Sequence, residues 1–96
     1  MPLKTVYIGI GSNMGDRLGH LRKAVCLLER MNSLVVTQSS GIYENRAIGI
    51  EDGNDFCNAV IEGFTDLSPW DLLDCCQAVE QEMGRIKTDV WTNRII

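Results

Sequence analysis

The sequence predicts an α+β domain of the ferredoxin-like type, with the order strand, helix, strand, strand, helix and the beginning of a last, truncated strand. Two observations support this class. Three segments show a period of two along the chain, which is typical of strands with one buried face, and two segments carry apolar residues at helical spacing. We therefore expect one antiparallel sheet with two helices on one face, in the form βαββα(β).

Length and composition indicate a single globular domain spanning residues 1–96. Hydrophobic residues make up 45% and charged residues 23%, so disorder is not expected. The formal net charge of -4 argues against general nucleic-acid binding, which depends on neutralising phosphates. The sequence has no apolar run long enough to span a membrane, and we expect a cytoplasmic protein with reduced thiols.

The cysteines give no sign of a metal site. Cys26, Cys57, Cys75 and Cys76 form no C-x-x-C pair, and with the single histidine, His20, they make no recognisable zinc site. Each is therefore interpreted as a small core hydrophobe, because free cysteine is among the most buried residue types.

The first strand is predicted over residues 5–10, where apolar residues occupy every second position. The GSNMGD stretch that follows is rich in residues that form turns or cap helices. A helix is predicted over residues 16–31, and its apolar stripe consists of Leu18, Leu21, Val25 and Leu28. The GSN triplet could also present backbone N–H groups to an anion, and the sequence leaves both interpretations open.

A second strand, over residues 34–43, is indicated by its Val, Thr and Ser content. A long loop is predicted over residues 44–55, and long loops in compact domains are often functional. The third strand is predicted over residues 56–64. Its alternation places Phe56, Asn58 and Val60 on one face and Cys57, Ala59 and Ile61 on the other.

The second helix is predicted to begin after Ser68, with Pro69 at its first position and Asp71 in its first turn. Its buried stripe consists of Leu72, Cys76, Val79 and Met83, and Gly84 is a natural stop. The chain continues as GRIKTDVWTNRII, with three cations, Arg85, Lys87 and Arg94, and with Trp91 among them. This segment is suited to a polyphosphate, or it is a plain charged loop.

Asn58 is the most informative polar residue inside a predicted strand, because asparagine is disfavoured there. It is either a solvent-facing residue or, beside the ring of Phe56, an amide that donates to and accepts from a flat heterocycle. On the second helix, Gln77 and Glu80 lie three positions apart on one surface. They are ordinary solvated residues or part of a site, and helical spacing alone does not decide between the two.

Several segments together resemble one enzyme family. They are YIGIGSNMGDR, SSGIYENRAIG, DFCNAVIEG, and LLDCCQAVEQEMGR followed by WTNR. In this order and spacing they resemble the 6-hydroxymethyl-7,8-dihydropterin pyrophosphokinase family of folate biosynthesis, over residues 5–96. The resemblance implies transfer of the terminal diphosphate of ATP to the hydroxymethyl group of the pterin, with release of AMP and with Mg²⁺ as cofactor.

The resemblance also implies roles for individual residues. The residues implied to contact the pterin are Asn45, Ile48, Phe56, Asn58 and Trp91. Those implied to lie beside the nucleotide are Gln77, Glu80, Lys87, Trp91 and Arg94, and the implied catalytic residues are Arg85 and Arg94. Diphosphate transfer relies on positioning and on neutralising phosphate charge, which is why cations and metal ions dominate such chemistry.

The sequence departs from the family pattern where these roles are concerned. Asn45, Arg46 and Ala47 stand where the family usually has a threonine and prolines, and Lys87 stands where an arginine with its bidentate fork is common. The family's Asp-x-Asp motif, which holds two Mg²⁺ ions on the last strand, would follow Ile96. We therefore predict no metal ligands within the chain.

Two hypotheses follow from the sequence. The first is a pterin pyrophosphokinase of which these 96 residues are an N-terminal part, or whose catalytic end comes from another chain. The resemblance puts the Mg²⁺ ligands after Ile96, so we expect the 96 residues alone to be poorly active or inactive. The second is a non-catalytic relative that acts as a ligand-binding or assembly module. The expected partners are pterin and ATP, with no nucleic acid and no membrane, and with self-association or a partner strand at the incomplete sheet edge.

Overall fold

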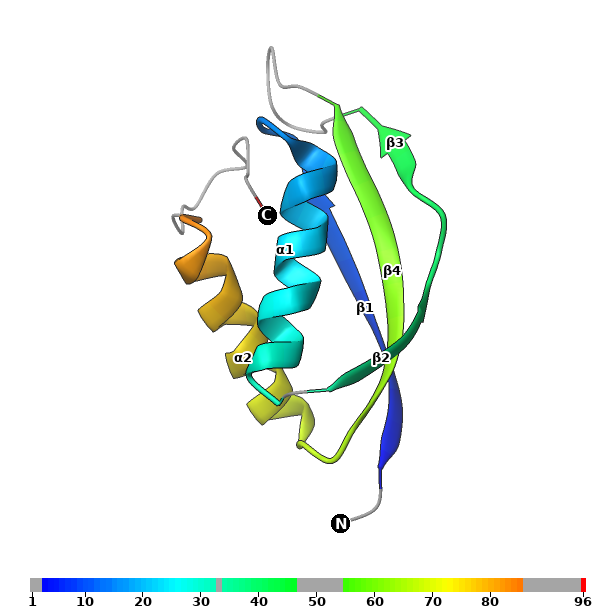
Figure 1. The fold of residues 1–96 in the computed structure, drawn as a ribbon, viewed down its shortest axis with the longest axis vertical. Coiled ribbons are helices and arrows are strands. Elements are labelled where there is room, and N and C mark those ends of the chain that lie inside the picture. The colour runs from blue at the N-terminus through cyan, green and yellow to red at the C-terminus, as the bar shows by residue number, and fades with distance from the viewer. Residues whose placement is uncertain (1–2, 33, 47–54, 86–95) are drawn as a thin grey trace.

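The computed structural model describes residues 3–32, 34–46, 55–85 and 96 (Figure 1). Its elements are β1 (Lys4–Ser12), α1 (Arg17–Arg30), β2 (Val35–Ser39), β3 (Tyr43–Asn45), β4 (Phe56–Thr65) and α2 (Pro69–Glu82). Both helices lie on one side of a single sheet, whose other face they leave uncovered (Figure 1). The predicted α+β fold is confirmed.

The sheet is antiparallel and is built around β4. β1 pairs with one edge of β4, and β2 and β3 pair with the other edge. The register brings distant residues together, because Gly11 and Tyr43 both lie opposite Asn58. Among the described residues, β1 pairs with β4 alone. β4 is therefore the strand through which the three other strands are connected.

The prediction of one continuous strand over residues 34–43 is wrong. β2 ends at Ser39 and β3 begins at Tyr43. Between them, the Ser40 amide donates to the Val60 carbonyl at 2.8 Å, while the Ser40 hydroxyl accepts from the Val60 amide at 2.9 Å. The serine side chain thus replaces a backbone acceptor and interrupts the ladder. β3 then extends to Asn45, inside the predicted loop.

The helix starts are confirmed. The Asp16 carboxylate accepts from the Gly19 amide at 3.1 Å, and the Ser68 hydroxyl accepts from the Asp71 amide at 3.1 Å. These caps satisfy backbone donors that a helix leaves unpaired at its start. Each helix has 14 residues, and within the described ranges no helix has the length and apolar character needed to cross a membrane.

The core lies between the helices and the inner face of the sheet. Its buried hydrophobic residues are Leu21, Ala24, Leu27 and Leu28 of α1, Leu34, Cys57, Ala59 and Ile61 of the sheet, Val79 and Met83 at the end of α2, and Ile96. The predicted α1 stripe is correct for Leu21 and Leu28 but wrong for Leu18, which is 43% exposed. The buried stripe is centred on Ala24, so Leu18 lies at its edge. On α2, Leu72 and Cys76 are only half-buried.

The four cysteines are free thiols in different surroundings. Cys57 belongs to the core, and Cys75 and Cys76 pack partly against it. The prediction of a core position is wrong for Cys26, which is exposed because it lies outside the buried stripe of α1. Burial raises the pKa of the Cys76 thiol, and the neighbouring Cys75 and Glu80 raise it further, so this thiol stays protonated at neutral pH.

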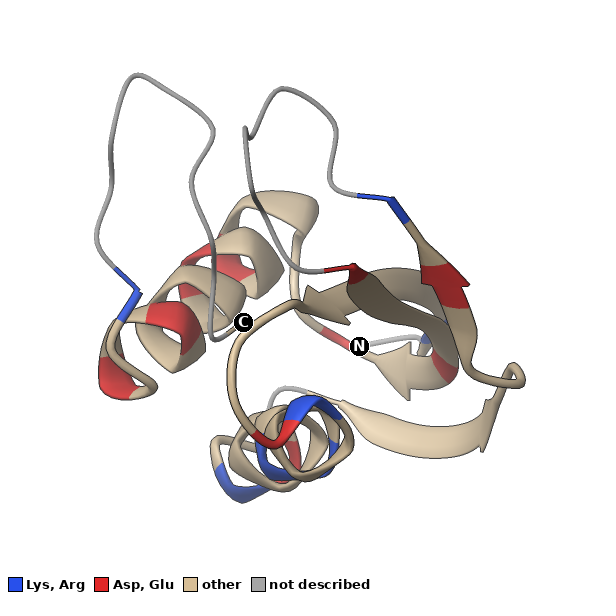
Figure 2. Ribbon diagram, turned by 90° about the horizontal axis from the view of Figure 1, so that it is seen from above, with Lys and Arg blue, Asp and Glu red and all other residues tan. Residues whose placement is uncertain are grey.

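The two helices carry opposite charge (Figure 2). α1 has four cationic residues and one acidic residue in RLGHLRKAVCLLER, whereas α2 has four acidic residues and no cationic one in PWDLLDCCQAVEQE. The helices pack against each other, so their charges attract across the helical layer.

Candidate functional site

Two asparagines form a pair on the uncovered face of the sheet. Asn45 ends β3 and Asn58 lies in β4, and the Asn58 side-chain amide donates a hydrogen bond to the Asn45 side-chain oxygen. The Asn45 amide in turn donates to the Arg46 carbonyl at 3.2 Å. The strand register brings the two side chains together although they are thirteen positions apart. The pair presents amide groups suited to the polar edge of a heterocycle.

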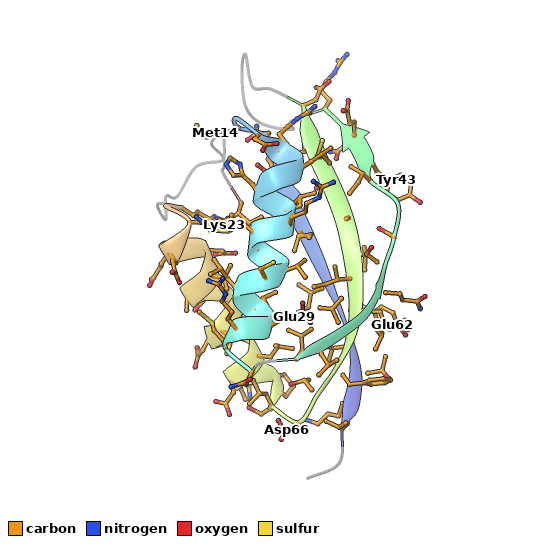
Figure 3. The ribbon with its side chains drawn as sticks, viewed as in Figure 1. Met14, Lys23, Glu29, Tyr43, Glu62 and Asp66 are labelled. Atoms are coloured by element: carbon orange, nitrogen blue, oxygen red, sulfur yellow. The ribbon has the colours of Figure 1, made fainter. Side chains whose placement is uncertain are left out.

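A hollow of about 240 Å³ lies beside this amide pair. It is lined by Gly9, Ile10 and Gly11 of β1, Tyr43 of β3, and Asn58, Ala59 and Val60 of β4. Figure 3 shows Tyr43 on the side of the sheet away from both helices. Gly9 and Gly11 supply no side chains, so the hollow opens over β1. Tyr43 and Val60 give it apolar walls, and Asn58 gives it a polar one.

Phe56 shares the uncovered face with Asn58, as the strand alternation predicts. The helix-facing residues of β4 are buried, whereas Phe56 and Asn58 are half-buried. Asn45 lies opposite Phe56 in the register. The structure therefore groups three of the predicted pterin-contacting residues, Asn45, Phe56 and Asn58, at one end of the sheet.

A row of hydrogen-bonded polar side chains, from Tyr7, Glu62 and Gln38, crosses the same face beyond the hollow and is called the polar ladder below. Tyr7 lies opposite Glu62 in the register, and Gln38 lies opposite Glu62 on the other side. The Tyr7 hydroxyl donates to one Glu62 oxygen at 3.1 Å, and the Gln38 amide donates to the other. The hydrogen bond to Glu62 raises the pKa of Tyr7, and the negative charge of Glu62 adds to the shift.

The end of α2 brings Glu80 and Arg85 together. The Gly84 amide donates to the Gln81 carbonyl at 3.0 Å and the Arg85 amide donates to the Glu80 carbonyl at 2.9 Å, which is a Schellman motif. Gly84 has a positive φ, +93°, as this motif requires. The chain reverses there, and the Arg85 guanidinium donates to the Glu80 carboxylate at 2.8 Å. Gln77, one turn earlier on α2, is half-buried.

The predicted site residues thus fall into two groups within the described ranges. Asn45, Phe56 and Asn58 lie on the uncovered sheet face, and Gln77, Glu80 and Arg85 belong to the helical layer. The remaining predicted residues, Ile48, Lys87, Trp91 and Arg94, lie outside the described residues. The structure pairs Asn45 with Asn58 and Glu80 with Arg85, and it does not bring these two pairs into contact.

The GSN triplet is a turn leading into a capped helix. Ser12 and Asn13 are fully buried, and the Ser12 hydroxyl lies 3.3 Å from Nδ1 of His20. The Asp16 carboxylate already occupies the start of α1 as its cap. A second anion there would be repelled by this carboxylate, so the geometry favours the turn over an anion site.

Sequence reasoning missed three residues of this region. Gly9, Gly11 and Tyr43 line the hollow, but neither glycine attracted attention as a site residue. The sequence did contain a signal for the two glycines. Val6, Ile8 and Ile10 pack partly against the core, and strand alternation therefore places Gly9 and Gly11 on the opposite face. Glycine inside a strand often marks a bulge or a close approach of a ligand or another backbone, and of these two glycines Gly9 is exposed and Gly11 is buried.

The described residues contain no group of three or more His, Cys, Asp or Glu side chains that could hold a metal ion. Two carboxylates close to the predicted site residues are held in ion pairs, Glu44 with Arg17 and Glu80 with Arg85. These described residues therefore do not fit a bound Mg²⁺, which prefers several oxygen ligands.

Comparison with known proteins assigns the chain to a family. Residues 7–96 match the family described as 7,8-dihydro-6-hydroxymethylpterin-pyrophosphokinase (HPPK). The chain belongs to this family, as the sequence motifs predict.

Several relatives carry the name 2-amino-4-hydroxy-6-hydroxymethyldihydropteridine pyrophosphokinase. The Bacillus subtilis protein is 43% identical over 88 residues, which cover 92% of this chain and 53% of that protein. The Aquifex aeolicus protein is 39% identical over 94 residues, covering 98% and 58%. The Haemophilus influenzae protein is 33% identical over 92 residues, covering 96% and 58%. The chain thus spans little more than half the length of these relatives.

Proposed function

We propose that this chain supplies the pterin-binding part of a 6-hydroxymethyl-7,8-dihydropterin pyrophosphokinase, which transfers diphosphate from ATP to the pterin and releases AMP. The observation that carries the proposal is the Asn45–Asn58 pair beside the hollow on the uncovered sheet face. Family membership makes diphosphate transfer the expected reaction. The expected cytoplasmic location stays a prediction.

On the pterin side, a flat, polar ring would lie over the glycines of β1. The Asn58 amide would pair with the polar edge of the ring, and Asn45 would orient that amide through their hydrogen bond. Phe56, on the same face, would stack on the ring. Ile48 and Trp91 are proposed to complete the pocket, as the resemblance implies.

On the nucleotide side, Gln77 and Glu80 are proposed to lie beside ATP, together with Lys87, Trp91 and Arg94. Arg85 and Arg94 would neutralise charge that develops on the transferred phosphates. In the ligand-free chain, the ion pair with Glu80 orients the Arg85 guanidinium toward α2. The same pair compensates the charge of Arg85, so a phosphate has to compete with the Glu80 carboxylate for this cation.

Mg²⁺ is proposed as the cofactor that ATP brings to the site. The described part of the chain offers the ion no group of carboxylates, and the resemblance puts the family's carboxylate ligands after Ile96, so we expect the ATP phosphates to be its main ligands here. For the same reason we expect the isolated 96-residue chain to bind the pterin and to release AMP slowly or not at all.

The test is a titration of the purified chain with 6-hydroxymethyl-7,8-dihydropterin, followed by fluorescence, with AMP formation measured in the presence of ATP and Mg²⁺. Asn58→Ala should weaken pterin binding by roughly 1–3 kcal/mol, because polar groups of the ring would be left unpaired. The matched control is Gln38→Ala, which removes an amide from the far row of the same face. It should leave the pterin affinity unchanged.

Three outcomes separate the hypotheses. Pterin binding that depends on Asn58, with AMP formation, supports the enzyme and refutes our expectation of low turnover. The same binding without AMP formation favours the ligand-binding module for the isolated chain. Absence of pterin binding, or equal binding by the Asn58→Ala variant, refutes the proposed role of the amide pair.

A further inference from the structure

Arg17 joins three elements at the end of the sheet that carries the amide pair. It is the first residue of α1. Its Nη1 donates to the Asp55 carbonyl at 2.9 Å, and its Nη2 donates to the Glu44 carboxylate at 3.1 Å. Glu44 lies in β3, and Asp55 directly precedes β4. One guanidinium therefore holds both β3 and the start of β4 against the start of α1.

The strand that Arg17 holds has little else to fix it. β3 has three residues and all of them are exposed, so burial of side chains contributes little to its position. Its backbone pairs with β4 along one short stretch, and short exposed segments open easily. The Glu44 side chain links β3 to the helical layer. The carboxylate oxygen of Glu44 that accepts from Arg17 also lies 3.9 Å from the Cys57 thiol.

The residues next to these contacts are those of the candidate site. Asn45 follows Glu44 in β3, and Phe56 follows Asp55. Side chains alternate across a strand, so Glu44 reaches inward to Arg17 while Asn45 points to the uncovered face, where Asn58 donates to it. A displacement of β3 would therefore separate Asn45 from Asn58.

We propose that Arg17 is a positioning residue for the ligand site, which keeps Asn45 and Asn58 paired by anchoring β3 and the start of β4. The ligand part of this inference rests on the proposed function. The Arg17 side chain is 31% exposed and that of Glu44 is 60% exposed, so the ion pair is screened and adds little to global stability. Its effect is on the position of one short strand.

The experiment compares Arg17→Gln, Arg17→Lys, Glu44→Gln and the double variant of Arg17→Gln with Glu44→Gln. Arg22→Gln is the matched control, because Arg22 is an exposed arginine of the same helix. Three quantities are measured for each: hydrogen exchange of the β3 amides in the ligand-free chain, the urea midpoint, and the dissociation constant for the pterin substrate.

We expect the β3 amides of Arg17→Gln and Glu44→Gln to exchange faster than those of the parent, and pterin affinity to fall about threefold to tenfold. The urea midpoint should stay within the range of Arg22→Gln. The double variant should show less than the product of the two single effects, because both substitutions remove the same ion pair between Arg17 and Glu44. Arg17→Lys should be intermediate, since one ammonium lacks the fork that reaches both acceptors.

Each contrary result decides the matter. Unchanged β3 exchange in Arg17→Gln would overturn the positioning role, whatever the pterin affinity. Faster exchange with unchanged pterin affinity would overturn its link to the ligand. A urea midpoint that falls well below that of Arg22→Gln would show a global structural role instead. If the parent chain binds no pterin, the proposed function fails, and the exchange data still decide whether Arg17 positions β3.

Discussion

The two faces of β4 show opposite chemistry within one strand. On the helix-facing side, Cys57, Ala59 and Ile61 are 2%, 5% and 2% exposed and form part of the core. On the other side, Phe56 and Asn58 are half-buried and Val60 is 45% exposed, beside the hollow and the amide pair. Residues that stabilise the core and residues of the proposed ligand site are thus one position apart along the chain, so substitutions on neighbouring residues should affect different properties.

The largest effect is expected on the helix-facing side. Ile61→Ala removes a fully buried side chain and leaves a cavity between the sheet and the helices. The free energy of unfolding should fall by roughly 2–5 kcal/mol, which is the range for truncation of large buried aliphatic residues. Urea denaturation followed by circular dichroism measures this change.

Val60→Ala is the matched control for Ile61→Ala, because it truncates the adjacent β-branched residue on the other face. Its side chain is 45% exposed, so the free energy of unfolding should change by about 0.5 kcal/mol or less. Equal losses in the two variants would contradict the contrast between the two faces of β4, because they would show that the uncovered face is packed as tightly as the core.

The next effect is expected on ligand binding. Gly9→Val places a branched side chain in the hollow, because a Cβ at Gly9 meets no atom within 4 Å and Gly9 lines that hollow. Pterin binding should weaken by roughly 1–3 kcal/mol, because the valine would occupy space that the ring is proposed to fill. The free energy of unfolding should stay equal or rise by up to about 1 kcal/mol, because valine favours strands and glycine does not.

Gly41→Val is the control for Gly9→Val. A Cβ at Gly41 also meets no atom within 4 Å, and Gly41 is not among the residues that line the hollow. Pterin titration of both variants should show a loss for Gly9→Val alone. A loss of similar size in both would mean that the hollow does not hold the ring.

Local patterns in the sequence predicted the fold well. The alternation along residues 56–64 assigned both faces of β4 correctly, and Ser68, Pro69 and Gly84 marked the ends of α2. The break between β2 and β3 could not be predicted, because it depends on the Ser40 hydroxyl meeting the Val60 amide, a contact across twenty positions. Composition and spacing report on neighbours in the chain and contain little about such distant partners.

The candidate site was predictable only in part, for the same reason. Asn58 attracted attention because asparagine is unusual in a strand, and its partner Asn45 was implied by the family resemblance. The hydrogen bond between them depends on the register of β3 against β4. The contacts of Arg17 with Glu44 and Asp55 span 27 and 38 positions, and no sequence pattern pointed to them. The site therefore depends on the strand register, and the register is determined by the complete fold and not by local sequence patterns.

The smallest expected effect concerns the polar ladder on the uncovered face. The hydrogen bond to Glu62 raises the pKa of Tyr7 above the ordinary value of 10.0. Because the folded-state pKa is the higher one, the contribution of this pair to stability is complete below about pH 10 and is lost as the pH rises through the raised pKa.

Since the sequence has two tyrosines, a Tyr43→Phe background lets phenolate absorbance report on Tyr7 alone. Glu62→Gln should move the Tyr7 midpoint down toward its ordinary value, whereas Asp66→Asn, which removes an exposed carboxylate elsewhere, should leave it in place. An unchanged midpoint in Glu62→Gln would mean that this face carries no coupled ladder, and that its polar residues act separately in water.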